Sequence, residues 1–550
     1  MIDKKVFLTV AVCFGIFLLW NAFVAIPPKA PPKKTAPVAS ASTQPTSAPT
    51  AEMAMNAAPS SAPVAVETKH ISVESDKMKA EWKNVGAALD GLTLKDYREG
   101  GTTRVQEKHP VQLIADFGGQ PVDGTQFLVA GVPFSFADLA ADGTTAITMT
   151  GAHAGLNGKA RWQLETLPYV MRLDVELENT TQAAQQVIAA LRISGVFNEK
   201  TLKNKGTFEP PPDLALPVAY ADDKLYKHEQ GAGDAPPDSQ KLLWAGIDRQ
   251  YFLLAAAPLQ TNIAATRFDE LRAVNDPMLM RMSATLEETP RVLEPGKKTT
   301  YSYRVYGGPK ASRLLAAAGQ GFEEAIDYKV WFMPLGFLSR PMLWILNQAY
   351  SLVHSYGLAI LILTLIVKLI LLPVTQKSFV SMQMMKDLKP ELDKIKEKFP
   401  GDREKQGLET MALYKARGVS PFGGCLPALL QMPVYFALWR TLYAAVELYQ
   451  QEFLWLGDLT AKDPYYILPV LLGGAFFVQQ KLSPPAGDPQ QQKIMMFLMP
   501  PLMTLFMVQL SSGLVFYVLV NTILTIAQQA YIGRRFGKTP ALVPANKRPA

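Results

Sequence analysis

Residues 361–375 read LILTLIVKLILLPVT, and this stretch decides the fold class. Apart from Lys368, its side chains are apolar or only weakly polar, and crossing a bilayer takes about 20 such residues. Other runs of similar character follow along the chain. The sequence therefore predicts a multi-pass α-helical membrane protein that carries a positive charge inside one of its spans.

Composition excludes several other classes of protein. The net charge is +7, but the basic residues gather beside the apolar runs, where the positive-inside rule explains them without a nucleic-acid partner. The two cysteines, Cys13 and Cys425, lie in or beside different apolar runs and indicate neither a disulfide framework nor a zinc site. The five histidines form no HExxH, and GxSxG and P-loop motifs are absent from the sequence. We predict no enzyme, metal or cofactor.

The N-terminal 310 residues divide into three parts. Residues 1–26 are predicted to be a retained transmembrane anchor, because the apolar run ends in AIPP rather than at a signal-peptidase site. Residues 27–66 hold nine prolines and no aromatic residue, which predicts a disordered linker. Residues 67–310 resemble a soluble β protein: in MRLDVELEN, Leu173, Val175 and Leu177 alternate with charged residues. We expect an antiparallel sandwich outside the cytoplasm.

The remaining chain is predicted to form helices. Residues 376–420 are rich in charge and show helical periodicity around a PGD turn, which predicts a cytoplasmic helical hairpin. With the anchor, the positive-inside rule is satisfied by six spans and two cytoplasmic termini. The expected segments are connecting and interfacial helices at 311–342, spans at 343–375, 425–449, 465–482, 494–511 and 513–533, and a short basic tail at 534–550.

Lys368 is expected about 10 Å inside the membrane, by the helical rise of 1.5 Å per residue. Helical side chains lean toward the N-terminus, here toward the bilayer centre, which disfavours snorkelling to the cytoplasmic surface. The only carboxylate in the other predicted spans, Glu447, is near the outer end of the third. We therefore predict that Lys368 faces a water-filled cavity, with a snorkelled or backbone-paired lysine as the alternative.

Polar residues at similar depth are candidates for the wall of that cavity. In the last span they recur at steps of three and four residues and so share one helix face. Each by itself is also compatible with ordinary hydrogen bonding between helices. The candidates are Thr364, Gln431, Tyr517, Asn521, Thr525 and Gln528.

Several long motifs resemble one known family. They read VSPFGGCLPALLQMPVYFALWR (419–440), DLTAKDPYYILPVLLGG (458–474), DPQQQKIMMFLMPPLM (488–503) and SSGLVFYVLVN (511–521). They are similar to the YidC insertases, a family shared with the mitochondrial Oxa and chloroplast Albino proteins. The likeness covers about 330–535, and the N-terminal anchor, linker and β domain resemble the Gram-negative type.

The resemblance implies a five-helix core around a hydrophilic groove that opens to the cytoplasm and to lipid, and a periplasmic domain of the supersandwich type. Lys368 would take the place of the groove's positive residue, which is arginine in many members. Implied partners are nascent membrane proteins, the Sec translocon, the ribosome through the hairpin and tail, and the lipid bilayer. The implied location is the bacterial inner membrane.

The predicted function is membrane protein insertion without chemistry. A polar or acidic flank of the substrate enters the groove, where Lys368 attracts it, while the apolar segment slides into lipid. The residues expected to form this hydrophobic slide are Tyr435, Leu438, Met499 and Met503. The alternatives are a secondary transporter with Lys368 as its substrate site, a periplasmic or intramembrane enzyme, and a purely structural assembly factor.

Overall fold

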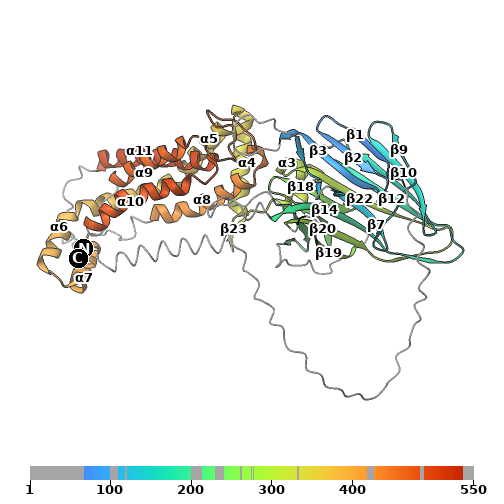
Figure 1. The fold of residues 1–550 in the computed structure, drawn as a ribbon. Coiled ribbons are helices and arrows are strands. Elements are labelled where there is room, and N and C mark those ends of the chain that lie inside the picture. Colours follow the sequence, from blue (N-terminus) through green and yellow to red (C-terminus); the bar gives the residue numbers. More distant parts are fainter. Residues whose placement is uncertain are drawn as a thin grey trace, which may run out of the picture.

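A β domain followed by a helical part makes up the described chain (Figure 1). The predicted anchor and linker and nearly all of the tail lie outside the described residues. The computed structural model describes residues 67–98, 110–114, 116–117, 120–199, 214–228, 241–260, 263–273, 276, 278–330, 333–417, 426–482 and 489–536.

Two nine-stranded sheets form the β domain, and the described strand pairs are antiparallel. The first sheet has the order β1-β2-β3-β7-β14-β20-β19, with β4 paired to β3 and β8 paired to β7. Its strands are β1 (His70–Glu74), β2 (Met78–Lys83), β3 (Ala88–Arg98), β4 (Pro110–Gln112), β7 (Thr125–Val129), β8 (Val132–Pro133), β14 (Ala189–Asn198), β19 (Ile263–Arg272) and β20 (Leu279–Glu288).

The second sheet has the order β16-β15-β17-β18-β22-β12-β11-β10-β9. Its strands are β9 (Asp138–Asp142), β10 (Ala146–His153), β11 (Leu156–Leu164), β12 (Val170–Asn179), β15 (Leu216–Ala221), β16 (Lys224–Lys227), β17 (Leu242–Asp248), β18 (Phe252–Pro258) and β22 (Lys298–Pro309). Short two-stranded pairs join β5 (Asp116–Phe117) to β6 (Gln120–Pro121), β13 (Gln185–Val187) to β21 (Arg291–Leu293), and β23 (Lys329–Val330) to β24 (Met333–Pro334).

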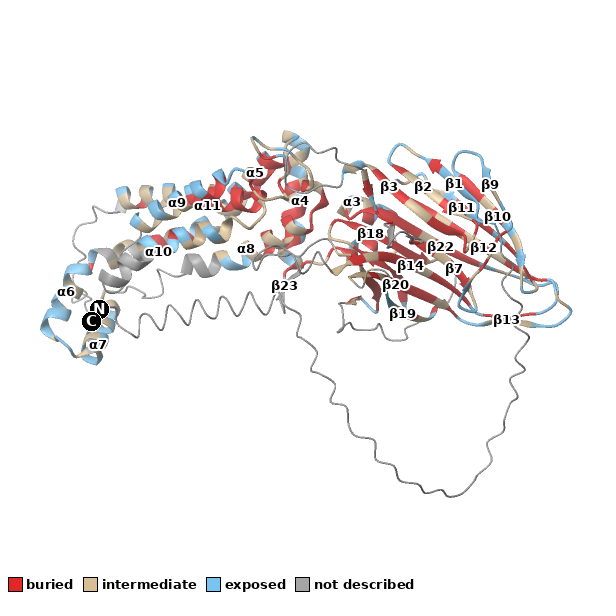
Figure 2. Ribbon diagram, viewed as in Figure 1, coloured by how far each residue is buried: buried red, intermediate tan, exposed pale blue. Residues whose placement is uncertain are grey.

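The alternating sequence patterns explain how the two sheets pack. On β12, Leu173, Val175 and Leu177 are fully buried, as predicted. Figure 2 shows the buried residues running along the strands. Trp82 of the first sheet and Trp162 of the second lie 6.0 Å apart between ring centres, so large aromatic side chains fill the space between the layers. The prediction of a β-rich domain is confirmed.

The start of the second predicted span needs correction. The sequence predicts one span over 343–375, but α4 (Gly336–Val353) ends before α5 (Tyr356–Asp387) begins. His354 closes α4 with a left-handed backbone, at φ 51°, which breaks the helical hydrogen bonds. The connection from the β domain to α4 contains α3 (Ser312–Ala318) and the 3-10 turn η1 (Phe322–Ala325).

Further helices complete the chain. Gly401, at φ 84°, turns the chain between α6 and α7, and the Asp402 side chain caps α7 by accepting a hydrogen bond from the Lys405 N–H. The helices are α6 (Lys389–Lys398), α7 (Arg403–Ala416), α8 (Leu426–Ala444), the 3-10 turn η3 (Val446–Leu448), α9 (Ile467–Leu482), α10 (Pro489–Met507) and α11 (Ser512–Phe536).

Helix α11 packs between α5 and α9. Helix α10 packs against α9, and α8 is held mainly by α4. Within the described residues, α8 and α10 make no comparable contact with each other. By length and composition, Tyr356–Met385 and Ser512–Arg534 are long and apolar enough to cross a membrane, whereas the apolar parts of α9 and α10 are shorter.

Candidate functional site

A line of hydrogen-bonded polar side chains runs between α5, α8 and α11, and we call it the polar seam. It brings most of the predicted cavity residues together with two that were not among the candidates for the cavity, Thr375 and Tyr435. Its members are Lys368 and Thr375 on α5, Gln431 and Tyr435 on α8, and Tyr517, Asn521, Thr525 and Gln528 on α11.

Lys368 is half-buried in the seam, and its partner is uncharged. Its Nζ donates a hydrogen bond of 2.6 Å to Thr525 Oγ1, and the Thr525 hydroxyl donates in turn to the Asn521 carbonyl at 2.7 Å. Within the described part of the chain no carboxylate pairs with Lys368. An ammonium has three donors, so the hydroxyl leaves capacity for further acceptors. The charge is oriented but not neutralised.

Two side-chain hydrogen bonds join α8 to α11. Asn521 Nδ2 donates to the Tyr435 hydroxyl at 2.9 Å, and Gln431 Nε2 donates to the Tyr517 hydroxyl at 3.2 Å. The rings of Tyr435 and Tyr517 meet edge to face, with centres 6.0 Å apart. Tyr517, Asn521 and Thr525 are buried, so at this level the seam is closed by its own partners.

At one end of the seam, α11 also bonds to α5. Gln528 Nε2 donates to Thr375 Oγ1 at 3.1 Å, while Gln528 Oε1 is buried and accepts no hydrogen bond in the described structure. The seam therefore ends in an acceptor without a partner. Such a group is costly to leave unpaired in a dry site.

Two of the predicted site residues, Thr364 and Leu438, lie apart from the polar seam. Thr364 is buried, and its hydroxyl bonds to the Ile360 carbonyl of its own helix, so it does not line the seam. Leu438 is fully buried, so it forms part of the protein core rather than a slide exposed to lipid. Tyr435 contributes its hydroxyl to the seam. Burial depends on which helices flank α8, and periodicity alone does not reveal this.

Exposed apolar residues remain available on α8 and α10. Met432, next to Gln431, is 48% exposed, and Met499 is 39% exposed, while Met503 is intermediate. Sequence reasoning missed Met432. The sequence did contain a signal for it. Neighbouring side chains of a helix are about 100° apart around its axis, so Met432 points away from the seam that Gln431 faces.

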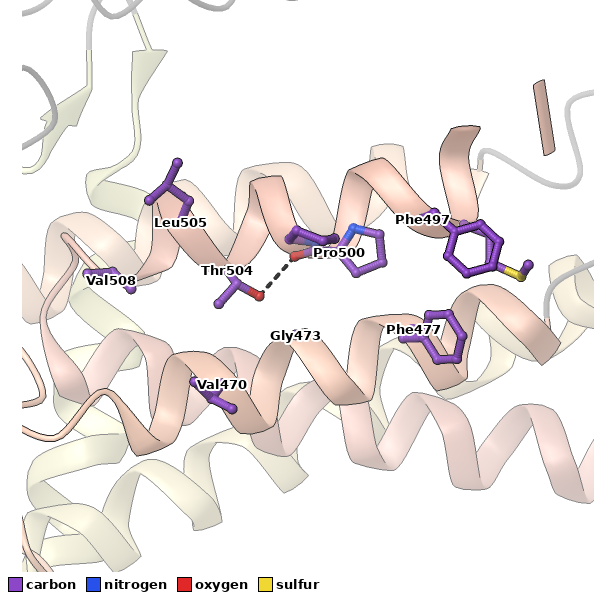
Figure 3. A pocket seen from close by; sticks show the side chains of 10 residues that line it. Val470, Gly473, Phe477, Phe497, Pro500, Thr504, Leu505 and Val508 are labelled. Carbon is purple, nitrogen blue, oxygen red and sulfur yellow. Dashed lines mark hydrogen bonds between the residues drawn. The ribbon is translucent and has the colours of Figure 1, made fainter. Parts of the chain in front are cut away.

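A separate apolar cavity of about 540 Å³ lies between α9 and α10 (Figure 3). At Gly473 the two helices approach closely, because a Cβ there would collide with Thr504 Oγ1. The Thr504 hydroxyl donates to the Pro500 carbonyl at 2.9 Å, so it is already satisfied. This cavity shares no residue with the polar seam and offers no charge. Its lining residues are Val470, Gly473, Phe477, Met496, Phe497, Pro500, Pro501, Thr504, Leu505 and Val508.

Comparison with known proteins covers nearly the whole chain. The family of the 60Kd inner membrane protein matches residues 348–539, and the YidC periplasmic domain matches residues 70–345. A "Membrane protein insertase YidC" from Anaeromyxobacter dehalogenans (strain 2CP-C) is 34% identical, covering 98% of this chain and 99% of the relative. Another from Geotalea uraniireducens (strain Rf4) is 34% identical, covering 97% and 99%.

Among solved structures, one described as an active YidC insertase with its first transmembrane domain resolved is 18% identical to the chain. The match covers 85% of this chain and 93% of the solved chain, with a TM-score of 0.36. The relatives with known names do not support the secondary-transporter alternative.

Proposed function

The chain belongs to the YidC family of membrane protein insertases, an inner membrane family, and we propose that it inserts its substrates through the polar seam. Insertion needs no covalent chemistry, and the protein is not an enzyme. The observation that carries the proposal is the hydrogen bond between Lys368 and Thr525, a charge held among helices by a neutral partner. A charge that has an orientation but no counter-ion is suited to receive one from outside.

The polar seam would act by exchanging hydrogen bonds. The bonds between Gln431 and Tyr517 and between Asn521 and Tyr435 join neutral side chains, each contributing only about 1 kcal/mol net. A polar flank of an incoming segment replaces these partners one at a time. The flank therefore never meets bare hydrocarbon, where each unsatisfied polar group costs several kcal/mol.

Lys368 would give this exchange its preference for negative charge. Its two further donors can bind the carboxylate of an acidic flank at the depth of Thr525. A membrane potential that is positive outside pulls the same flank outward by about 2.3 kcal/mol per charge per 100 mV. The attraction by Lys368 and the pull of the membrane potential both act on the charged flank and not on the apolar segment.

The apolar segment would leave between α8 and α10. These helices each pack against other neighbours, and each has an exposed methionine, Met432 and Met499. Flexible thioethers adapt to varied apolar partners. The side of the protein between these two helices is our candidate for the lateral path into lipid, in place of a slide formed by Leu438.

The membrane topology completes the proposal. We propose six spans with both termini in the cytoplasm, α6 and α7 as a cytoplasmic hairpin, and contacts with the Sec translocon and the ribosome. The hairpin is supported by the ion pair between Arg417 and Glu391, 2.7 Å apart, which joins the end of α7 to α6. Its surface leaves Leu408 and Met411 exposed for a partner.

Site-specific photo-crosslinking tests the proposed path. A photoreactive residue at Gln431 should capture the flank of a stalled nascent chain, whereas one at Val470, exposed in the α9–α10 cavity, should capture mainly lipid. Labelling of lipid alone at both positions would contradict passage through the seam.

A further inference from the structure

Charged side chains of alternating sign connect the interior of the β domain to α8, and we call them the charge chain. Its members are Lys310, Asp248, Lys227, Asp327 and Arg440. The distances are 2.7 Å from Lys310 Nζ to Asp248 Oδ1, 3.0 Å from Lys227 Nζ to Asp248 Oδ2, 3.7 Å from Lys227 Nζ to Asp327 Oδ2, and 3.4 Å from Arg440 Nη2 to Asp327 Oδ2. Arg440 Nε also donates to the Asp327 carbonyl at 2.7 Å.

One end of the charge chain is fixed inside the β domain. The side chains of Lys310 and Asp248 are only 7% and 9% exposed, and removing Asp248 would leave the buried charge of Lys310 uncompensated. The other end reaches the outer part of α8, where the side chains of Arg440 and Asp327 are 20% and 24% exposed. The charge chain therefore links the second sheet to one helix of the polar seam.

The supports of α8 are unequal along its length. Its outer half is held by α4, where Ser339 Oγ donates to the Ala437 carbonyl at 3.1 Å, and by Arg440. Its inner half reaches α11 through the hydrogen bonds of Gln431 and Tyr435.

Helical geometry shows how the outer end acts on the inner end. Arg440 follows Gln431 by nine residues, or about 13.5 Å along the axis and about 180° around it. The two side chains thus project from opposite faces of α8. Tyr435 lies on the same side of Pro433 as Arg440, whereas Gln431 lies beyond this proline, which removes one backbone hydrogen bond of the helix.

We propose that Arg440 and Asp327 are positioning residues: by fixing the outer end of α8 to the β domain, they hold Gln431 and Tyr435 against α11. This inference rests on the proposed function of the polar seam. It gives the β domain a role in insertion that requires no ligand of its own. Loss of a hydrogen bond to a charged group is expected to shift the population of aligned α8 by about tenfold.

Distances between spin labels test the alignment directly. The full-length chain, with Cys13 and Cys425 changed to Ser, carries labels at Met432→Cys and Ile523→Cys, which are exposed on α8 and α11. In liposomes, Arg440→Met should broaden the distance distribution and lower insertion of a single-span substrate, and Arg440→Lys should restore part of both. The matched control is Arg340→Met, since Arg340 joins Glu324 of η1 to α4 rather than to α8, at 2.8 Å.

The label distances and the insertion activity of the two variants decide whether Arg440 positions α8. Broadening in Arg440→Met but not in Arg340→Met, together with reduced insertion, supports positioning. An unchanged distribution in Arg440→Met, or equal broadening in both variants, overturns it. The label distances do not depend on insertion, so a failure of the seam as an insertion path would appear separately, as normal insertion in Lys368→Glu.

Discussion

Reversing the charge of the polar seam is the most direct test of how the protein works. Lys368→Glu places a carboxylate where an ammonium now donates to Thr525. A substrate with an acidic flank then meets repulsion instead of attraction. Lys368→Met removes the charge while keeping most of the apolar stem.

The structure sets the size of the expected effect. Two unit charges 4 Å apart interact by about 4 kcal/mol at an effective dielectric constant of 20. Lys368 is half-buried, so water reduces this figure, yet about 1.4 kcal/mol already changes a population tenfold. We expect insertion of an acid-flanked substrate to fall about tenfold in Lys368→Met and further in Lys368→Glu, whereas Lys368→Arg should retain it.

The assay is insertion of a small single-span substrate by the purified protein in liposomes, with acidic and neutral flanks compared. Lys481→Glu is the matched control, because Lys481 is exposed at the end of α9, outside the seam. Folding should survive in Lys368→Met, since the Thr525 hydroxyl keeps its own bond to the Asn521 carbonyl. Thermal unfolding checks this.

Equal insertion of acidic and neutral flanks by Lys368→Glu would refute the reasoning. So would an equal loss for both flanks, because the charge would then serve the fold and not the substrate.

Three other perturbations follow from the contacts. Asn521→Leu leaves the half-buried Tyr435 hydroxyl without its 2.9 Å partner, which should cost about 1–3 kcal/mol in chemical unfolding; an unchanged unfolding midpoint would contradict that bond. Gly473→Ala places a Cβ in collision with Thr504 Oγ1 and should lower the melting temperature, whereas Gly474→Ala meets nothing within 4 Å and should not; similar melting of both would argue against the close approach of α9 and α10. The pKa of Asp248 is lowered, because the charges of Lys227 and Lys310 outweigh a burial that alone would raise it. The stabilisation of the fold by the Asp248 carboxylate is therefore complete above the unfolded-state pKa of about 4 and is lost as the pH falls through the pKa of the folded state. Lowering the pH from 7 should therefore reduce the melting temperature of the unchanged protein by more than that of Asp248→Asn.

Local patterns predicted much of the β domain. Alternation in MRLDVELEN gives β12 its inward Leu173, Val175 and Leu177, because successive side chains of a strand point to opposite faces. The order of the strands in the sheet could not be predicted in this way. Strand β12 lies between β11 and β22, and β22 is far from β12 along the chain. Such pairing depends on long-range contacts that no short window contains.

The candidate site was predicted in part for a similar reason. The stripe of Tyr517, Asn521 and Thr525 follows from helical spacing, and all three lie in the seam. Thr364 shares a face with Lys368, yet its hydroxyl bonds to its own helix. Periodicity identifies a face of a helix but not the neighbour that covers it.

The sequence by itself determined that the chain carries long apolar segments typical of a membrane protein, that a β domain precedes the helical core, and that Lys368 lies in an apolar helix. These features follow from the composition and spacing of neighbouring residues. Only the tertiary structure decided that Thr525 accepts the hydrogen bond of Lys368, that Leu438 is buried in the core, and that Arg440 forms an ion pair with Asp327. Each of these depends on which helix packs beside which, and packing is a property of segments that are distant in the chain.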